Sequence, residues 1–217
     1  MTGNYVNSIH YYILLIHVIA GILSLFAGII AIVATPKGNK LHKKSGILYF
    51  WCMVIIFITS LLAILFFKFN IFLFGIAVLS FFTSFTGYRS LKRKKPNDVK
   101  WYDKFVAYAG LMSGLGLAGF GVFTYFKYSN IGLVILCIVF GMLLASNAYK
   151  DIKHFKKSEY GKMWWWFHHL NMMMASFIAT VTAALVNNIY KIVKLGDWDF
   201  IFWLLPKIIL VTFFIRS

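Results

Sequence analysis

The chain contains a succession of apolar runs, each close to the length that crosses a lipid bilayer as a helix. A transmembrane helix needs about 20 mostly apolar residues, and short polar segments separate the runs. The predicted spans are residues 9–34, 47–67, 71–88, 105–126, 131–149, 164–186 and 200–215, the last of them short and interrupted by Pro206. We therefore predict an all-α integral membrane helical bundle of about seven transmembrane helices, with residues 1–217 as a single transmembrane helical domain.

Composition supports this class. Hydrophobic residues make up 61% of the 217 residues and charged residues 13%, whereas soluble domains have about 45–50% and about 25%. A soluble fold of this size could not bury so much apolar surface. The same figures exclude a disordered chain and a collagen-like fibre. Cys52 and Cys137 both lie inside apolar runs, so the sequence gives no sign of a disulfide-stapled secreted module.

The basic residues predict an orientation. The net charge is +16, and 16 of the 22 Lys and Arg residues follow the first, third and fifth runs, at positions 37–44, 89–104 and 150–162. The alternate connections hold only Lys68, Lys127, Lys191 and Lys194. Cytoplasmic loops carry the excess of positive charge. We therefore expect the N-terminus outside, the C-terminus inside and a location in the inner (cell) membrane, with the bilayer and not nucleic acid as the partner of the basic residues.

The acidic residues offer no catalytic constellation. All six lie at or beyond the ends of the predicted spans, so no carboxylate is expected in mid-membrane. This weakens a proton-driven pump, which places Asp, Glu or His along its path, and any site built on paired carboxylates. Enzymatic activity stays uncertain, and the sequence favours its absence.

Histidines are the remaining candidates for chemistry. His17 is predicted inside the outer leaflet, where an unpaired imidazole is costly. It is either hydrogen-bonded to a neighbouring helix or a ligand of haem or a metal. His42 and one of the adjacent pair His168 and His169 are expected to converge at the inner side, with only one of that pair facing the bundle. His154 is expected to be solvated in a basic loop.

Met172, Met173 and Met174 could offer a thioether to haem iron or copper. Three consecutive residues point around a helix, however, so ordinary packing is the favoured interpretation. Trp101, Trp164, Trp165, Trp166 and Trp198 fall at predicted span ends, as interfacial aromatic residues do.

Small residues predict close helix packing. Five glycines crowd the fourth span, and a second row of small residues follows the same spacing in the first span. Such residues let helix backbones approach closely in a membrane. We expect packing within the monomer, and the alternative is a homo-oligomer through the fourth helix. The residues are Gly110, Gly114, Gly116, Gly119 and Gly121 in the fourth span, and Ala20, Ser24 and Gly28 in the first.

Lys207 is the only basic residue near the middle of a predicted span, and it follows Pro206. Either the seventh segment is tilted or half inserted, which would place Lys207 at an interface, or Lys207 faces a polar cavity and binds an anionic group.

Residues 85–92 and residues 146–153 form a weak internal sequence repeat. Each segment leads through a basic stretch to a tryptophan, Trp101 or Trp164, and an apolar run. It indicates either duplicated two-helix units or the common pattern of a helix, a basic loop and a helix.

The stretch from His42 to Phe50, after a first helix that bears His17, resembles a family of bacterial multi-pass membrane proteins catalogued as a domain of unknown function. The resemblance continues through residues 169–179, Thr182-Ala183 and residues 203–206. Family members often carry Arg where this chain has Met172. The resemblance implies a multi-pass bacterial membrane protein with a histidine-bearing bundle and brings no established activity.

Three functions are therefore open. The first is a redox bundle in which His17, His42 and His169 bind a b-type haem or a metal. The second is a small-solute or ion transporter with a proline-broken seventh helix and Lys207 as a ligand-binding residue. The third is a non-catalytic interaction or assembly protein. The sequence identifies no particular small-molecule ligand.

Overall fold

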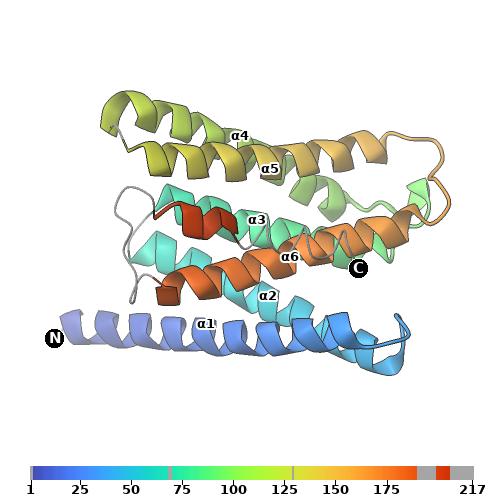
Figure 1. The fold of residues 1–217 in the computed structure, drawn as a ribbon, viewed down its shortest axis with the longest axis horizontal. Coiled ribbons are helices and arrows are strands. Elements are labelled where there is room, and N and C mark those ends of the chain that lie inside the picture. The colour runs from blue at the N-terminus through green and yellow to red at the C-terminus, as the bar shows by residue number, and fades with distance from the viewer. Residues whose placement is uncertain (1, 68–69, 129, 190–198, 206–217) are drawn as a thin grey trace. The chain divides into compact units, whose positions relative to one another are not determined.

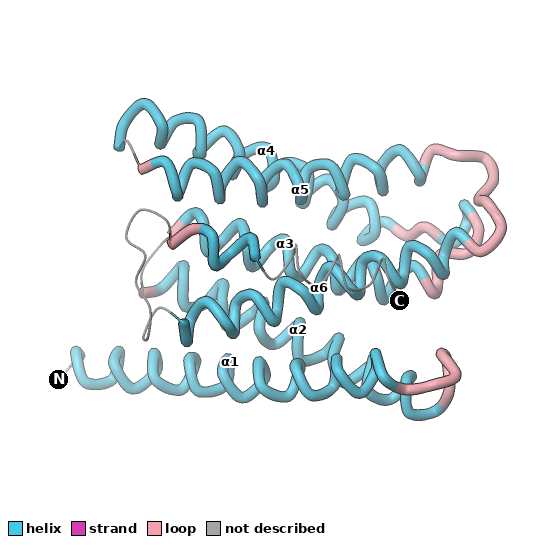
Figure 2. Tube along the Cα trace, in the orientation of Figure 1, coloured by secondary structure: helices cyan, strands magenta, loops and turns pink. Residues whose placement is uncertain are grey.

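The computed structural model describes residues 2–67, 70–128, 130–189 and 199–205, and among these every regular element is a helix (Figure 1). The elements are α1 (Thr2–Val33), α2 (Lys40–Phe66), α3 (Ile71–Ser90), the short 3₁₀ helix η1 (Pro96–Asp98), α4 (Trp101–Tyr128), α5 (Ile131–Phe155) and α6 (Trp164–Ile189). Figure 2 shows the short loops that join them. This confirms the all-helical prediction.

Six of the helices are long and apolar enough to cross a membrane. Their apolar stretches are Ser8–Val33, Lys40–Ile64, Ile71–Ser90, Trp101–Lys127, Ile131–Phe155 and Trp164–Val186. The chain is therefore a multi-pass membrane protein in its architecture. Of the predicted seventh span the structure describes residues 200–205, of which 201–205 are helical, and Pro206 and Lys207 lie outside the described residues. The count of seven and the orientation stay predictions.

Several helices extend beyond the apolar runs that predicted them. The second begins at Lys40 and not at residue 47, because the Asn39 side chain accepts a hydrogen bond from the His42 backbone N–H at 2.8 Å. An N-cap of this kind satisfies a free amide at the start of a helix. The fifth continues to Phe155, beyond residue 149. Basic residues expected in loops therefore lie on helix ends.

The chain divides into two compact units, residues 1–81 and 82–217, so that α3 belongs partly to each. In the first unit α1 and α2 form an antiparallel hairpin (Figure 1). The predicted row of small residues on α1 is buried: Ala20 is 4% exposed, Ser24 is 0% exposed, and Gly28 is also buried. The small face of α1 thus packs inside its unit.

In the second unit α4 and α5 lie side by side at very close range. A Cβ atom added at Gly114 would lie 2.7 Å from the Gly141 carbonyl oxygen, and one added at Gly141 would lie 2.7 Å from the Gly114 carbonyl oxygen. Gly110 and Gly121 also face atoms of the chain, whereas Gly116 and Gly119 have nothing within 4 Å. The expected packing within the monomer is therefore present. A homo-oligomer contact through α4 stays a prediction, and of the five glycines Gly116 and Gly119 are the two with open space for it.

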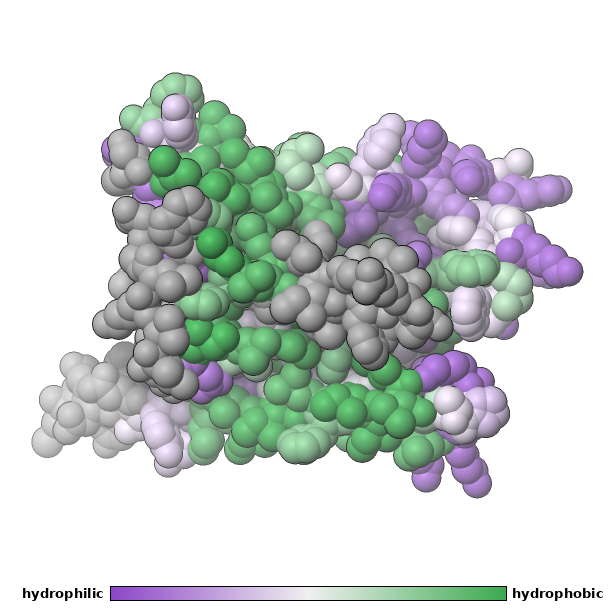
Figure 3. Space-filling view, in the orientation of Figure 1, coloured by the Kyte–Doolittle hydropathy of each residue, from purple (hydrophilic) through white to green (hydrophobic). Residues whose placement is uncertain are grey.

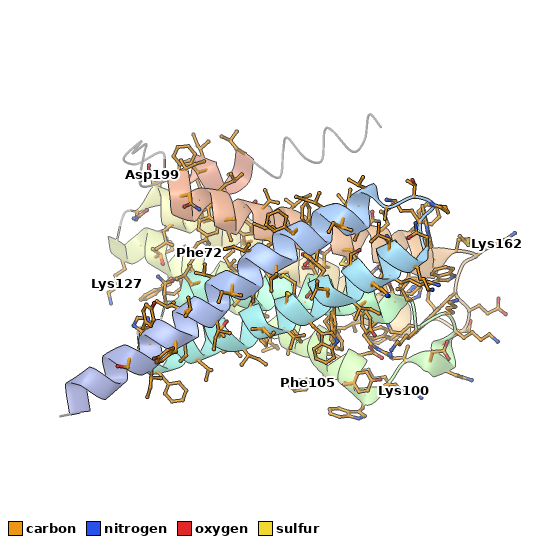
Figure 4. The ribbon with its side chains drawn as sticks, turned by 90° about the horizontal axis from the view of Figure 1, so that it is seen from below. Phe72, Lys100, Phe105, Lys127, Lys162 and Asp199 are labelled. Carbon is orange, nitrogen blue, oxygen red and sulfur yellow. The ribbon has the colours of Figure 1, made fainter. Side chains whose placement is uncertain are left out.

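Figure 3 shows hydrophobic residues over the middle of α4 and α5 and hydrophilic residues over the α5–α6 connection. In Figure 4, Lys100 and Lys162 lie at one end of the second unit and Lys127 lies at the other. The candidate site described below belongs to the end that carries Lys100 and Lys162.

Candidate functional site

His17, which the sequence predicted in the outer half of the membrane, is hydrogen-bonded to the neighbouring helix. Its Nδ1 lies 2.9 Å from Thr59 Oγ1. The Thr59 hydroxyl donates to the Ile55 carbonyl at 2.8 Å, so its oxygen accepts from the imidazole N–H. This is the helix–helix contact that the sequence left as one of two alternatives.

His42 lies in the first turns of α2 and contacts a different part of α1. Its Nδ1 donates to the Ala31 carbonyl at 2.9 Å. Ala31 follows His17 by 14 residues on the same helix, which is about 21 Å along the axis at 1.5 Å per residue. His17 and His42 therefore do not share a site.

His168 and His169 both find partners inside the second unit, on different helices. The Nδ1 of His169 donates to the Gly87 carbonyl of α3 at 2.8 Å. The Nε2 of His168 lies 2.9 Å from Asp151 Oδ1 of α5. The prediction that only one of the pair faces the bundle is therefore wrong. Two neighbouring side chains about 100° apart on α6 thus each meet a helix, His169 on α3 and His168 on α5.

Met172 and Met173 pack as the favoured interpretation predicted. Met172 is 8% exposed, and a Cβ atom at Gly87 would lie 2.9 Å from Met173 Cγ and Sδ. Gly87 thus gives Met173 room against α3.

Asp151 is the centre of a buried ionic network that the sequence did not reveal. Its carboxylate is paired with Arg93, whose Nη2 lies 3.3 Å from Oδ2, as well as with His168. Arg93 is 1% exposed and Asp151 is 1% exposed. The Arg93 guanidinium also lies 5.1 Å from the centre of the Phe155 ring. The sequence placed both charged residues at or beyond span ends and gave no sign that they are buried as a pair.

A second buried pair stands beside the first. Arg89 Nε donates to Asp103 Oδ1 at 2.8 Å and its Nη2 to Oδ2 at 2.7 Å, a two-pronged contact. The Lys100 backbone N–H also donates to this carboxylate at 2.9 Å. Asp103 is 2% exposed. Two of the acids predicted at span ends are therefore near helix ends, but both are buried against arginine.

Aromatic rings close around His154. Its ring centre lies 3.6 Å from that of Trp164 and 3.9 Å from that of Tyr160, and Trp164 lies 4.7 Å from His168. His154 is 6% exposed, so its predicted solvation is wrong. Trp164, predicted as an interfacial residue, stacks between the two histidines.

Five buried polar atoms of this cluster make no geometrically ideal hydrogen bond among the described residues. Two of them, Asp151 Oδ1 and His168 Nε2, face each other at 2.9 Å as an ion pair, which leaves Arg93 Nε, His154 Nε2 and Tyr160 Oη without a partner in the described part of the chain. Each such atom costs about 1–3 kcal/mol. Burial raises the pKa of the Tyr160 hydroxyl above its ordinary value, so the hydroxyl stays protonated at neutral pH and can donate. The cluster therefore offers unused hydrogen-bonding capacity.

Tyr160 also lines an open pocket of about 350 Å³ between two connections of the chain. Lys94, Lys95, Pro96 and Asn97 contribute one wall, and Ser158, Glu159 and Tyr160 contribute the other. The Lys94 ammonium lies 4.5 Å from the centre of the Trp165 ring, which places a cation at this end of α6. We call the pocket, together with Arg93, Asp151, His154 and His168, the inner-end site, after the side of the membrane on which the predicted orientation would place it.

The sequence held a signal for this site. Asp151 and His154 are three residues apart, which puts them on one face if the helix continues past residue 149. The fifth span was expected to end there, so this face was not recognised. Among the described residues no group of three His, Cys, Asp or Glu side chains is placed to hold a metal ion. Lys207, the predicted anion-binding residue, lies outside the described residues.

Comparisons of the chain with protein-family models, curated proteins and solved structures gave no significant match, so the function has to be argued from this site alone.

Proposed function

We propose that the protein is a seven-span membrane protein, with its N-terminus outside, that binds a small anionic molecule at the inner-end site as the recognition step of a carrier. The observation that carries this proposal is the set of three buried polar atoms without partners, Arg93 Nε, His154 Nε2 and Tyr160 Oη, beside a pocket walled by two lysines. Intramembrane ionisable groups commonly mark ligand pathways.

The unused atoms favour an anion over a cation. Arg93 Nε and Tyr160 Oη carry protons, and a neutral imidazole presents either a proton or a lone pair at Nε2. The two carboxylates nearby, Asp103 and Asp151, are already paired with arginine. What the cluster lacks is therefore acceptor oxygens, which a phosphate or a carboxylate would supply.

The rival interpretation is that the network only ties the helices together, as in an assembly protein. The variant Tyr160→Phe distinguishes anion binding from a purely structural role, because it removes the hydroxyl and keeps the ring that contacts His154. On our proposal the variant binds phosphate about tenfold more weakly, the value of one lost hydrogen bond. Without ligand it unfolds at a higher temperature, since an unpaired buried hydroxyl is gone. Tyr149→Phe, an exposed tyrosine on α5, is the control and changes neither property.

Binding is measured on the purified full chain by titrating inorganic phosphate and following tryptophan fluorescence, because Trp164 and Trp165 adjoin the cluster. A saturable change that weakens in Tyr160→Phe supports the proposal. A wild-type chain that responds to no phosphate, sulfate or carboxylate probe contradicts it.

A histidine-bound haem is the second candidate, and one observation favours it. Nδ1 of His42 and of His169 donates to a backbone carbonyl, the contact that metal-bound histidines commonly make through their other ring nitrogen. His17 and His42 are too far apart to ligate one iron together, so a pair of those two does not fit.

The haem candidate is tested by a visible spectrum of protein produced with ample haem. A Soret band that shifts on reduction with dithionite is expected if His42 or His169 is an axial ligand, and His169→Ala or His42→Ala then weakens it according to which residue binds. A colourless preparation with no metal by mass spectrometry removes this candidate.

A further inference from the structure

The two walls of the pocket carry opposite charges. Lys94 and Lys95 stand on the connection between α3 and α4, and Glu159 stands on the connection between α5 and α6. Asn97 and Ser158 add neutral groups that can donate hydrogen bonds. The pocket is thus cationic on one side and anionic on the other.

The cationic wall is fixed by its own backbone. The Lys95 N–H donates to Asp98 Oδ2 at 2.9 Å, and the Asp98 N–H donates to the Lys95 carbonyl at 3.0 Å, which holds the short helix η1. The carboxylate of Asp98 is therefore engaged in the turn. Lys94 rests on the Trp165 ring at 4.5 Å. The Lys95 backbone and the Lys94 side chain are thus held by contacts within the chain.

The anionic wall is fixed by the aromatic cluster. The Tyr160 ring packs on His154 and lies 5.2 Å from Trp164. The Lys157 N–H donates to the His154 carbonyl at 3.1 Å, where α5 ends. Glu159 therefore follows a defined helix end and precedes an anchored ring.

This charge pattern favours a ligand that carries both charges over a simple ion. A bare anion held by Lys94 and Lys95 leaves Glu159 without a counter-charge, and a bare cation at Glu159 leaves the two lysines without one. A molecule with a phosphate at one end and a primary ammonium at the other satisfies both walls. The volume of about 350 Å³ lies at the lower end of the range of ligand pockets, about 300–1,000 Å³, and suits a small head group.

We propose that the pocket binds an aminoalkyl phosphate of the phosphoethanolamine type, with Lys94 and Lys95 at the phosphate and Glu159 at the ammonium. This inference rests on the proposed anion-binding function and names its ligand class. The connection that forms the cationic wall leads into α4, whose first residue, Trp101, is 77% exposed. Exposed tryptophans at helix ends mark the level of lipid head groups, so the membrane lipid is a local source of this chemistry, and the free phosphate ester is the soluble one.

The test uses the purified full chain in detergent with short-chain phosphatidylethanolamine, phosphatidylglycerol and phosphatidylcholine as probes. Wild type is expected to bind phosphatidylethanolamine about tenfold more tightly than phosphatidylglycerol, which lacks the ammonium, and than phosphatidylcholine, whose ammonium has no proton to donate. Glu159→Gln should remove this preference and leave the affinity for phosphatidylglycerol unchanged or slightly higher. The double variant Lys94→Met, Lys95→Met should weaken all three. Lys156→Met is the control, because Lys156 is exposed and does not line the pocket.

Free phosphoethanolamine distinguishes the two sources. If it displaces the lipid at comparable concentration, the soluble ester is the ligand, and if it does not, the lipid head group is. Equal binding of the three lipids by wild type, or a preference that survives Glu159→Gln, overturns the inference. The proposed anion binding fails separately, through the absence of any phosphate response or through a Tyr160→Phe chain that binds phosphate as wild type does.

Discussion

At the scale of single residues, Asp151 is the side chain on which most of the inner-end site depends. It faces a guanidinium on one oxygen and an imidazole on the other, and its side chain is 2% exposed. Buried charges are costly to desolvate, and their mutual attraction offsets that cost only while every partner is present. The arrangement is therefore sensitive to the loss of one member and tolerant of the loss of a whole pair.

We expect Asp151→Asn to destabilise the protein by about 3–5 kcal/mol, because Arg93 would stay buried without a counter-charge. The double variant Arg93→Met, Asp151→Leu should recover most of that loss, since no lone charge remains. The measurement is unfolding in detergent, followed by tryptophan fluorescence.

The matched control is Lys150→Met, an exposed neighbour on the same helix, with a change within about 0.5 kcal/mol. A loss as small as this in Asp151→Asn would mean that the carboxylate is solvated and would contradict the buried pair.

At this scale the sequence pointed to one member of the site, His168, through the pair His168 and His169. The residues it named as ligands, His17, His42 and His169, each make a defined hydrogen bond but lie outside the inner-end site. Arg93 and Asp151 escaped notice because they are 58 residues apart and no local pattern joins them. Charges near a span end are usually solvated, and only the tertiary packing shows that these two are not.

At the scale of helices, the contact between α4 and α5 depends on two glycines facing each other. A methyl group added at either glycine would meet the backbone of the other helix. At Gly114 it would lie 2.6 Å from Ala145 N, and at Gly141 it would lie 2.6 Å from Ala118 N. Backbone atoms cannot move aside as a flexible side chain can. The helices must therefore separate if either glycine gains a side chain.

Gly114→Ala is expected to destabilise the protein by about 1–3 kcal/mol, the usual cost of overpacking. Gly116→Ala lies two residues away in open space and should be neutral or stabilising by about 0.5–1 kcal/mol, since alanine favours the helix. Thermal unfolding of the two variants compares them directly. Equal effects would indicate that α4 and α5 do not approach as closely as described.

The helices themselves followed from the apolar runs, because a bilayer leaves few alternatives to a helix of that length. The ends of the helices could not be predicted in the same way, because hydropathy indicates which residues lie in the lipid and not the residue at which the helix begins or ends. Asn130 caps α5 with its side chain, accepting from Leu133 N–H at 3.0 Å, and Asn39 caps α2 in the same way. The extension of α5 to Phe155 is what brings Asp151 and His154 into the site.

At the scale of the whole molecule, the second unit contains a reciprocal arrangement. Gly87 packs on Met173, and Ala148 packs on Gly110. Gly87 and Ala148 hold equivalent positions in the internal sequence repeat. Gly110 lies nine residues after Trp101, and Met173 lies nine residues after Trp164. Two related helix–loop–helix units would produce such a pair of contacts, so the packing favours duplication over a shared loop pattern.

The same unit brings two of the three basic connections together. Arg93 and Lys94, after α3, contact Asp151 of α5 and Trp165 of α6. Lysines of both connections therefore lie at one end, whereas Lys127 lies at the other (Figure 4). A membrane that retains positive charge on its cytoplasmic side would hold this end inside, in agreement with the count of basic residues along the chain.

Orientation can be tested in cells by labelling single cysteines, because the native Cys52 and Cys137 are buried and give little background. Asn130→Cys, in the α4–α5 connection, should react with a membrane-impermeant maleimide from outside. Lys127→Cys, which leaves the cap of α5 intact, should behave in the same way.

Pro96→Cys and Lys100→Cys, in the α3–α4 connection, should react only after the membrane is permeabilised. A reporter fused after Arg216 should be cytoplasmic. Labelling of Pro96→Cys from outside would reverse the topology, place the inner-end site on the external face and make a ligand from the external medium its natural occupant.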